Sequence, residues 1–370
     1  MRIAIVGCGT IAQVMHIPYA AELPELEVHA LVDPAVDRAR TLAARNGVPH
    51  HFESTDELLT EVGTELDAAI VLTPPQAHAD AVIPLLANDV DVLVEKPLAI
   101  SPTDADRMVE AAAESDATAM VAYMKRYDPA YERAREEIDA IDEIDLITAY
   151  DVDPNHGRIL EEVYDTVGGE VPDSFVEAST RKRRRDALEA IGAPVDEADG
   201  VDDLAADYDW HLEHICHDVN ALRGLFGDVE RIDHVDVFAD GRYATAHLVY
   251  EGGHRCVLDS GLSNRNWFEE WIRVDAPDRA VTVEYSNPFI KNSPTEITVK
   301  QGIETLSETT HTPSYDESFK CEIRHFTRAA AGEASVETTF AEARDDVYLI
   351  ADLFRVYDGV EPLREYQSSH

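Results

Sequence analysis

The sequence predicts an α/β protein: a doubly wound parallel sheet first, then an α+β part with a large, mostly antiparallel open sheet. Over roughly the first 120 residues, short apolar runs alternate with helical patterns, which is typical of a doubly wound sheet. The run at 68–72 is continuously apolar, as expected of a parallel strand covered on both faces. After Tyr150, alternating apolar and polar runs separated by turn dipeptides predict antiparallel strands.

The chain opens on an apolar run at 2–6, which ends in the turn Gly7-Cys8-Gly9-Thr10-Ile11-Ala12. Gly7 permits a tight turn, Gly9 lets the backbone approach a pyrophosphate, and Ala12 keeps helix and strand close. The following helix would offer free N–H groups to phosphates. Asp33 ends the next strand, where it is placed to accept hydrogen bonds from ribose hydroxyls. This order of strand, glycine turn, helix, strand and acid predicts dinucleotide binding; the alternative is a glycine turn without a ligand.

Asp33 also bears on the choice of cofactor. A carboxylate at this position would repel the 2′-phosphate of NADP, and no arginine stands beside it in the sequence. Arg38 and Arg40 come later, on the expected helix at 36–46. We therefore predict NAD rather than NADP.

The remaining elements of the first part follow from local patterns. The helix at 36–46 stops at Gly47, and residues 54–57 form a capping box that opens another helix. Further helices are expected at 79–88 and 103–114, and strands at 90–94 and 117–122. Polar residues follow the strand ends at 73–78, 95–97 and 123–127. Ligands of such sheets bind at the carboxyl ends of the strands, so we expect the site there.

The second part begins with an irregular, charged stretch. We expect a Rossmann-type domain at 1–123 and an α+β domain at 124–370, with an insertion at about 155–207 that has one helical stretch near 174–191. A helix at 208–226 stops at Gly227. Strands are expected at 231–238, 243–250, 255–261, 267–274, 280–284 and 296–300, and helices at 315–331 and 340–357. We expect the last helix to pack back on the first domain.

The composition is strongly acidic. The 74 acidic residues outnumber the 31 basic residues and give a net charge of −43, spread along the whole chain. Because so acidic a folded protein repels itself in low salt, we interpret it as a halophile's protein whose charges high salt screens. The same field argues against nucleic acid and anionic membranes as partners. No apolar run reaches membrane-span length and no signal peptide precedes the first strand, so we expect a cytoplasmic protein.

Several motifs together resemble the glucose–fructose oxidoreductase/inositol dehydrogenase (Gfo/Idh/MocA) family. The likeness covers nearly the whole chain except about 155–207. The matching motifs are Gly7-x-Gly9-x-x-Ala12, Asp33, Thr73-Pro74-Pro75-x-x-His78, Glu95-Lys96-Pro97, Arg126-Tyr127-Asp128-Pro129, His217-Asp218 with Leu222-Arg223-x-Leu225-Phe226-Gly227, and Phe319-x-x-Glu322-x-x-His325-Phe326. The resemblance implies NAD(P)-dependent oxidation or reduction of sugars, cyclitols or related compounds, and a homodimer or homotetramer formed through the C-terminal sheet.

The resemblance also implies roles for single residues. Lys96 would reach the substrate oxygen and His217 would be the general acid/base. Glu213 stands one helical turn before His217, where many members have Asp. Pro75 stands where an Asn is often found. The implied cofactor contacts are Gly7, Gly9, Thr10, Ile11, Ala12, Asp33, Thr73, Pro74, His78, Glu95, Lys96 and Arg126. The implied catalytic residues are Lys96, His217 and Glu213, and the implied substrate contacts are Lys96, Tyr127, Glu213 and His217, with Lys125 nearby.

These residue types suit hydride transfer from a secondary alcohol or hemiacetal. A histidine titrating near neutrality can take the hydroxyl proton, and an ammonium stabilises the developing alkoxide. The hypothesis is an NAD-dependent oxidoreductase acting on a sugar or cyclitol. The alternatives are a glycosidase of the same fold that uses NAD, and a sensor that binds the dinucleotide without catalysis. Lys96 as an ordinary loop lysine and His217 as a structural helix histidine stay open.

Four further features need an interpretation. His211, His214, His217 and Asp218 have helix spacings compatible with metal ligands, but the stretch lacks the HExxH pattern, so we predict no metal. The basic run Arg181–Arg185 is either a solvated helix face pairing with acids, or an anion clamp or subunit contact. His156 and Arg158 are candidates to reach the active-site mouth. None of the four cysteines forms a CxxC pair, and we interpret Cys8 as a small filler.

Overall fold

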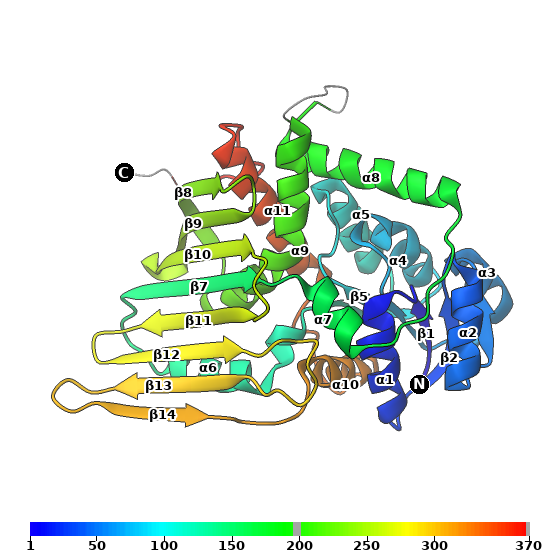
Figure 1. Ribbon diagram of the computed structural model, residues 1–370, viewed down its shortest axis with the longest axis horizontal. Coiled ribbons are helices and arrows are strands. Elements are labelled where there is room, and N and C mark those ends of the chain that lie inside the picture. Colours follow the sequence, from blue (N-terminus) through cyan, green and yellow to red (C-terminus); the bar gives the residue numbers. More distant parts are fainter. Residues whose placement is uncertain (195–200, 368–370) are drawn as a thin grey trace. The chain divides into compact units, whose positions relative to one another are not determined.

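The computed structural model describes residues 1–194 and 201–367, which form two compact units (Figure 1). Unit 1 comprises residues 1–123, 164–190 and 319–347, and unit 2 comprises residues 124–163, 191–318 and 348–370. A parallel six-stranded sheet lies in unit 1 and a mostly antiparallel eight-stranded sheet in unit 2. The predicted fold class is therefore confirmed.

The sheet of unit 1 has the order β3-β2-β1-β4-β5-β6, with every neighbouring pair parallel. The order reverses between β1 and β4, which is the switch point where such sheets bind ligands. Strand β4 is buried along its whole length, as expected for a parallel sheet. The strands are β1 (Arg2–Val6), β2 (Glu27–Val32), β3 (His50–Phe52), β4 (Ala68–Val71), β5 (Asp91–Glu95) and β6 (Ala119–Ala122).

Local sequence fixes the ends of the helices between these strands. They are a π-helical turn (Ala12–His16) continued by α1 (Ile17–Glu22), α2 (Val36–Asn46), α3 (Thr55–Val62), α4 (His78–Leu86) and α5 (Pro102–Ala113). Helix α2 ends at Gly47, whose φ of 69° suits glycine. Ser54 and Ser101 cap α3 and α5, because their side chains accept the backbone N–H groups of Glu57 and Asp104 at 3.2 Å.

Two later segments complete unit 1. One contains most of α8 (Asp173–Ile191), and the other contains most of α10 (Ser318–Ala330) and the start of α11 (Phe340–Tyr357). Thr339 forms an antiparallel bridge with Met120, and the Val121 N–H donates to the Thr338 carbonyl at 2.9 Å. A segment 217 residues later in the chain therefore pairs with the edge strand β6 and protects that edge.

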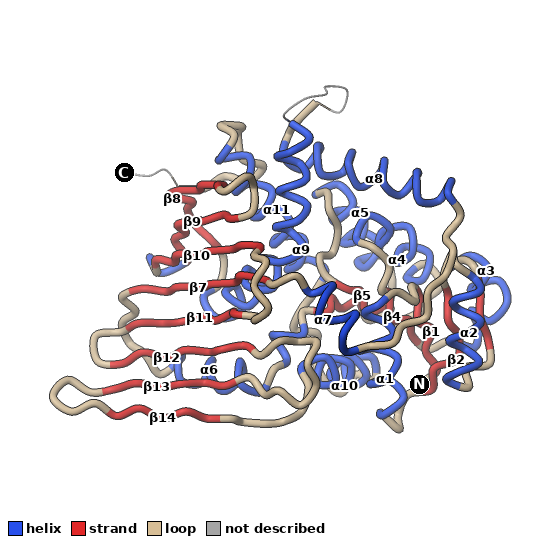
Figure 2. Tube along the Cα trace, in the orientation of Figure 1, coloured by secondary structure: helices blue, strands red, loops and turns tan. Residues whose placement is uncertain are grey.

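The sheet of unit 2 has the order β14-β13-β12-β11-β7-β10-β9-β8 (Figure 2). Strands β7 and β10 are parallel, and all other neighbours are antiparallel. The strands are β7 (Leu146–Asp153), β8 (Val229–Phe238), β9 (Tyr243–Tyr250), β10 (Arg255–Leu262), β11 (Glu269–Asp275), β12 (Arg279–Tyr285), β13 (Glu296–Gln301) and β14 (Ser307–His311). Helix α6 (Pro129–Asp139) lies against β12 and β13, and α9 (Val201–Phe226) lies against β7 and β10.

The expectations for the insertion are partly wrong. The structure has α7 (His156–Val163) as well as α8, and α9 begins at Val201 rather than at Tyr208. Ala205, Tyr208 and Leu212 are all buried and spaced three and four apart, so they continue one buried helix face. Residues 195–200 of the predicted irregular stretch lie outside the described residues.

Two strands of unit 2 are absent from the sequence prediction. Strand β7 ends in Asp151 and Asp153, and these acids hide the apolar alternation that identifies a strand. Strand β14 is polar and exposed at the sheet edge, so it has no buried face to mark it. Both are paired in register with their neighbours, so tertiary context defines them.

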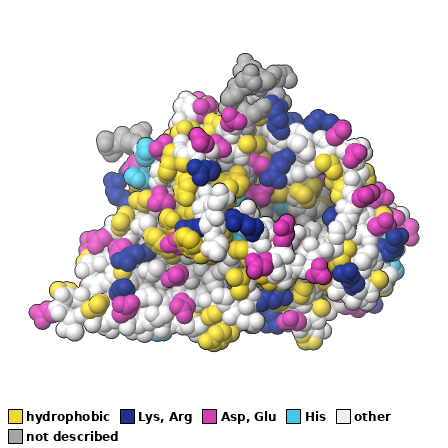
Figure 3. Space-filling model, viewed as in Figure 1, with side chains coloured by type: hydrophobic (Ala, Val, Ile, Leu, Met, Phe, Trp, Pro, Cys, Tyr) yellow, Lys and Arg dark blue, Asp and Glu magenta, His cyan; other side chains and the backbone are white. Residues whose placement is uncertain are grey.

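Acidic side chains are scattered over the face seen in Figure 3 rather than gathered in one patch. This distribution fits the acids' even spread along the sequence. Among the described residues, no helix combines the length and apolar character that crossing a membrane requires.

Candidate functional site

The two glycines of the first turn have different surroundings. Gly7 has a φ of 96°, and a Cβ there would lie 2.6 Å from the Leu72 carbonyl oxygen, so only glycine fits between β1 and β4. At Gly9, no described atom lies within 4 Å of the position that a Cβ would take. The turn therefore closes tightly at its first glycine and leaves an open cradle at its second.

The residues after the cradle begin the first helix. Thr10 is exposed, Ile11 is half-buried and Ala12 is buried. The Gln13 N–H donates to the Gly9 carbonyl at 3.2 Å, and the π-helical turn begins at Ala12. Turns of this type are frequent at functional sites.

Asp33 is buried, and its carboxylate already has partners. It accepts the backbone N–H groups of Cys8 and Ala35 at 2.8 Å, and the Arg38 guanidinium lies 2.7 and 2.9 Å from its two oxygens. The expectation that no arginine stands beside Asp33 is therefore wrong, because one turn of α2 returns Arg38 to it. Burial, followed by the charge of Asp33, raises the pKa of the Cys8 thiol to about 12, so Cys8 stays a neutral filler.

A pocket opens beside this turn, at the carboxyl ends of β1, β2 and β4. It encloses about 220 Å³, far more than the space a single water needs. Its lining includes Gly7, Val32, Pro34, Ser54, Thr73, Ala77 and Phe175. The buried Thr73 hydroxyl has no hydrogen-bond partner among the described residues. The open Gly9 cradle and this orphaned hydroxyl fit a bound dinucleotide.

His78 and Pro74 follow β4. The His78 ring is fully buried, with Nε2 2.8 Å from the Thr73 carbonyl and Nδ1 3.0 Å from the Pro97 carbonyl. Burial lowers the pKa of His78, although hydrogen bonds to carbonyls oppose the shift. His78 therefore connects the loops that follow β4 and β5 through its two hydrogen bonds. Pro74, by contrast, is exposed to solvent.

Glu95 ends β5 inside a buried polar group. His16 Nε2 lies 2.8 Å from Glu95, and the Lys96 N–H donates to the other carboxylate oxygen at 3.1 Å. Burial raises the pKa of Glu95, but the contacts with His16, aided by the charge and N–H of Lys96, leave that pKa below its ordinary value. Burial, aided by Glu95, raises the pKa of Glu322. The half-buried Lys96 precedes Pro97, and the peptide between them is cis.

In unit 2, the residues after β6 are buried. Lys125 forms an ion pair with Glu270, and its ammonium lies 5.3 Å from the centre of the Tyr285 ring. Arg126 donates to the backbone and side-chain oxygens of Asn220 at 3.1 Å. Arg126 thus holds α9 within unit 2, and Tyr127 is buried beside it in sequence. Their expected contacts with cofactor and substrate stay predictions.

A second buried group lies where β7 ends, and we call Lys125, Asp151, Asp218 and Glu270 the acid cluster. One oxygen from each of the three carboxylates lies within 4.8 Å of the others. Burial raises the pKa of Asp218 and of Asp151, and the charge of Lys125 opposes both shifts. Burial therefore favours the neutral forms of Asp151 and Asp218, while Glu270 forms the ion pair with Lys125.

Helix α9 presents the predicted catalytic stretch beside the acid cluster. Glu213 and His217, one turn apart, are both half-buried. His214 Nε2 contacts Asp153 at 2.8 Å, whereas His211 contacts Ser260 and the Gly241 carbonyl. His211 and His214 therefore bind different partners rather than converging as metal ligands. Burial lowers the pKa of His211 to about 4, although the hydrogen bond to the Gly241 carbonyl opposes the shift.

The other candidates of the insertion also have partners. His156 Nε2 lies 2.9 Å from Asp153, and Arg158 donates to the Asn264 carbonyl at 3.2 Å. In the basic run, Lys182 pairs with Asp104 and Asp186, and Arg185 pairs with Asp186 at 3.1 Å. These pairs favour the interpretation of the run as a helix face that pairs with acids.

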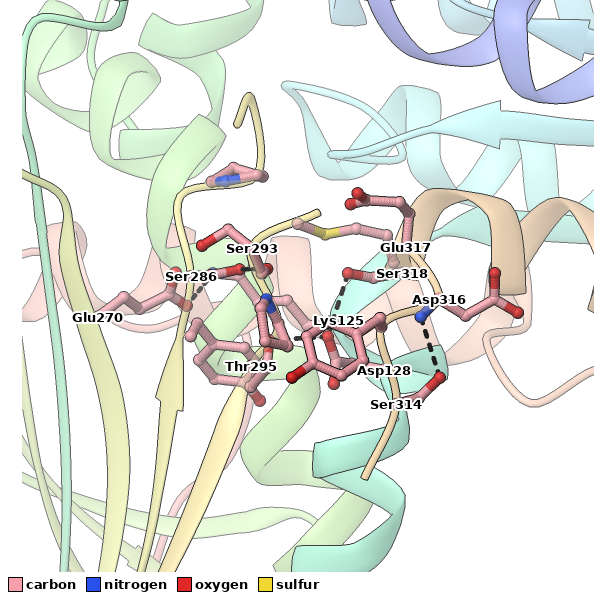
Figure 4. A pocket seen from close by; sticks show the side chains of 15 residues that line it. Lys125, Asp128, Glu270, Ser286, Ser293, Thr295, Ser314, Asp316, Glu317 and Ser318 are labelled. Carbon is pink, nitrogen blue, oxygen red and sulfur yellow. Dashed lines mark hydrogen bonds and ion pairs between the residues drawn. The ribbon is translucent and has the colours of Figure 1, made fainter. Parts of the chain in front are cut away.

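A small pocket of unit 2 borders the acid cluster (Figure 4). Within it, the hydroxyls of Thr295 and Ser318 donate to the Asp128 carboxylate at 2.8 and 3.2 Å. The pocket encloses about 20 Å³, which is room for one or two waters. It is too small for a sugar.

Sequence analysis missed four residues near these sites. They are Gln13, Arg38, Phe175 and Asp153. Arg38 could have been found from its spacing, because it lies five residues after Asp33, in the first turn of the helix α2 that begins at Val36. Phe175 comes to the pocket from a segment far from the other lining residues, which all lie between Val6 and Ala81, so spacing gives no information about it.

Comparisons with known proteins agree with the geometry of unit 1. Residues 1–123 match the model of the GFO_IDH_MocA family, described as an oxidoreductase family with an NAD-binding Rossmann fold. A scyllo-inositol 2-dehydrogenase (NAD(+)) from Bacillus subtilis is 31% identical over 140 residues, or 38% of this chain and 40% of that protein. A D-xylose 1-dehydrogenase (NADP(+)) from Haloarcula marismortui is 33% identical over 142 residues, or 38% of this chain and 39% of that protein. The match thus spans about two fifths of these relatives' length.

A solved structure shares the fold over a longer range. A 3-ketoreductase from Actinomadura kijaniata, in complex with NADP and TDP-benzene, aligns with a TM-score of 0.70 at 17% identity. The alignment covers 97% of this chain and 96% of that chain, so it includes both sheets. Residues 1–123 thus match the model of the GFO_IDH_MocA oxidoreductase family, and the glycine cradle and the buried acid after β2 fit the NAD-binding Rossmann fold that this model describes.

Proposed function

We propose that the chain is an NAD-dependent oxidoreductase that acts on a secondary alcohol or hemiacetal of a sugar, cyclitol or derivative. The observation that carries the proposal is the open cradle at Gly9, which lies at the switch point of the parallel sheet. The substrate class is supported by the relatives, which include an inositol dehydrogenase and a xylose dehydrogenase.

Three side chains carry the chemistry in this proposal. Bound NAD supplies the acceptor for the hydride when an alcohol is oxidised. His217 takes the hydroxyl proton, and Lys96 donates a hydrogen bond to the reacting oxygen as its negative charge develops. Glu213, one turn before His217 on α9, orients the ring or a substrate hydroxyl. Tyr127 completes the proposed substrate contacts.

The cofactor in this proposal is NAD rather than NADP. Asp33 places a buried carboxylate where the adenosine ribose would lie, and this charge disfavours a 2′-phosphate. Arg38 does not offset the effect, because its guanidinium is held by that same carboxylate. Relatives that use either cofactor are known, so the ion pair of this chain bears directly on the choice.

The setting is also a proposal. The net charge of −43 supports a protein that works in high salt, inside a halophile's cytoplasm. The sheet of unit 2 has helices against one face, and Tyr150 and Trp271 stack on each other from paired strands with ring centres 5.5 Å apart. These half-buried aromatics support subunit contacts through the sheet, as a homodimer or homotetramer, which light scattering in high salt would measure.

The test is the absorbance of reduced nicotinamide, followed in molar salt across inositols, pentoses, hexoses and nucleotide sugars, with NAD and NADP in parallel. Reduction of NAD by one compound is the expected result. Binding of NADH measured by calorimetry, without turnover of any compound, would count against an oxidoreductase and favour a sensor. Hydrolysis of a glycoside without net NADH would favour the glycosidase.

A further inference from the structure

Residues 164–179, which belong to unit 1, run across the carboxyl ends of its strands (Figure 1). We call this segment the strap. Its first fixed point is Val167, whose N–H donates to Gln13 Oε1 at 2.7 Å. The Gln13 amide donates in return to the Val167 carbonyl at 3.1 Å and to the Cys8 carbonyl at 2.9 Å. One side chain thus ties the strap to the glycine turn.

The strap next passes the start of α2. A Cβ on Gly169 would lie 2.8 Å from the Arg38 Cβ and 2.9 Å from the Ala35 Cβ. Real Cβ atoms do not come this close, so glycine lets the strap backbone lie directly on α2 beside Asp33. The strap therefore crosses the place where the adenosine ribose is expected.

The strap then reaches the pocket at the switch point. Phe175 lines this pocket together with Val32, Thr73 and Ala77, and it is 46% exposed. One helical turn later, the Ser179 hydroxyl accepts a hydrogen bond from the buried Gln76 side chain at 2.8 Å. A large aromatic ring thus faces the glycine turn from the strap side.

Helix α8 anchors the end of the strap. Lys182 forms ion pairs with Asp104 and Asp186, and the Thr103 hydroxyl donates to Glu189 at 2.5 Å. Asp104 and Thr103 belong to the first turn of α5, so α8 is fixed on the Rossmann domain rather than only adjoining it. The strap is held at both ends, with its aromatic residue between them.

We propose that the strap closes over the dinucleotide, with the Phe175 ring packed on the adenine, and that it makes release of the cofactor slow. The proposal rests on the dinucleotide site proposed above and adds residues from outside the Rossmann domain to it. Adenine has a flat apolar face, which an aromatic ring recognises by stacking. Release requires the strap contacts at Gln13 and Gln76 to open first.

The decisive experiment measures how fast NADH leaves the full-length protein. NADH fluorescence is followed in a stopped-flow instrument after mixing the complex with excess NAD. Phe175→Ala is expected to speed release by about tenfold or more, the scale of a lost base–aromatic stack. Val176→Ala is the matched control, because Val176 is similarly exposed on α8 but does not line the pocket. Phe175→Tyr keeps the ring and should keep the slow release.

A second measurement reports the strap itself. A glutamyl endopeptidase can cut after Glu170 in the strap and after Glu304, which is exposed between β13 and β14. NADH is expected to slow cutting at Glu170 and to leave cutting at Glu304 unchanged. Equal rates at Glu170 with and without NADH would count against closure of the strap.

The two proposals fail in different ways. If the wild-type protein binds no NADH or NADPH, both the dinucleotide site and the strap are wrong. If NADH binds and Phe175→Ala releases it at the wild-type rate, only the strap is wrong, and the oxidoreductase proposal stands. If Phe175→Ala releases NADH faster than the wild type, while Val176→Ala and Phe175→Tyr release it at the wild-type rate, both the dinucleotide site and the strap are supported.

Discussion

Asp151 and Glu270 lie directly opposite each other on the neighbouring strands β7 and β11. Both are almost completely buried, and Asp218 of α9 joins them from the helix layer. Opposed like charges are unfavourable in a sheet, and burial increases the cost. The pair persists because Lys125 supplies a buried ammonium and because burial raises the pKa of Asp151 and Asp218.

Removing that ammonium should destabilise unit 2. We expect Lys125→Met to lower the free energy of unfolding by about 3–5 kcal/mol at neutral pH, the usual cost of leaving buried charge unpaired. Urea denaturation at a fixed high salt concentration measures this change in the free energy of unfolding. Glu270→Gln removes one negative charge from the same cluster, so adding it to Lys125→Met should restore part of the loss. An additive double variant would contradict the electrostatic explanation.

Glu322 should make stability fall as pH rises. Its carboxylate oxygens are buried and accept no hydrogen bond from the described residues, and burial raises its pKa above the ordinary value of about 4.3. Between these two pKa values, the folded protein keeps a proton that the unfolded chain has released. The free energy of unfolding therefore falls by up to about 1.4 kcal/mol per pH unit in that window.

Glu322→Gln tests this dependence, because glutamine has no proton to release. We expect it to unfold like the wild type near pH 4, on the order of Glu322's unperturbed pKa, and to become progressively more stable than the wild type as the pH rises. The exposed Glu333→Gln corrects for the loss of one acid. If the difference in free energy of unfolding between Glu322→Gln and the wild type stays constant with pH, Glu322 is not the cause of the pH dependence.

The two glycines of the cradle should respond differently to alanine. Gly7→Ala forces a Cβ against the Leu72 carbonyl at a φ of 96°, so we expect a loss of about 2–3 kcal/mol of stability. Gly9→Ala meets no described atom, so stability should change by less than about 1 kcal/mol while NADH affinity falls. Thermal unfolding and NADH titration separate the effects. Unchanged affinity in Gly9→Ala would mean that the cofactor does not approach this turn.

Asp33 should control the choice between NAD and NADP. Asp33→Ala removes the carboxylate and releases Arg38 to bind a 2′-phosphate, so we expect the NADP/NAD affinity ratio to rise about tenfold or more. Arg38→Ala should shift the ratio the other way. Calorimetric titration with NAD and with NADP measures this ratio of affinities. If neither variant changes the ratio, other residues recognise the adenosine ribose.

Lys96 and His217 should separate catalysis from cofactor binding. We expect Lys96→Met and His217→Asn each to lower kcat by about 10²–10⁴-fold. NADH affinity should stay near wild type in His217→Asn. Lys300→Met, on strand β13, is the control lysine. Turnover that survives both substitutions would exclude the proposed mechanism.

Local pattern predicted much of unit 1 because its contacts are local. The glycine turn, the cap at Ser54 and the stop at Gly47 each depend on a few neighbouring residues, and each was predicted from them. The Asp33–Arg38 pair was not predicted, although its spacing allows it, because it forms only when the long Arg38 side chain turns back from α2 toward the end of β2. Strand β7 was missed because Asp151 and Asp153 occupy positions that usually carry apolar residues.

The contacts of the strap could not be predicted in this way. Gln13 and Val167 are 154 residues apart, and Gly169 meets Arg38 only after the chain has left the domain and returned. In the sequence, Gln13 lies in the helix that follows the glycine turn and Gly169 lies in the charged insertion, and nothing in either pattern points to the other segment. The role of such residues is set by the surface on which the fold places them.

Strand β7 is made early in synthesis, yet both of its sheet neighbours come late. Its parallel partner β10 ends at Leu262 and its antiparallel partner β11 ends at Asp275. On the ribosome, β7 must therefore wait for more than a hundred residues before it can pair, with two acids at its end that need Lys125 and α9 in place. Such long-range pairing slows folding, so a nascent chain of this protein carries β7 as an unpaired strand until β10 has been made.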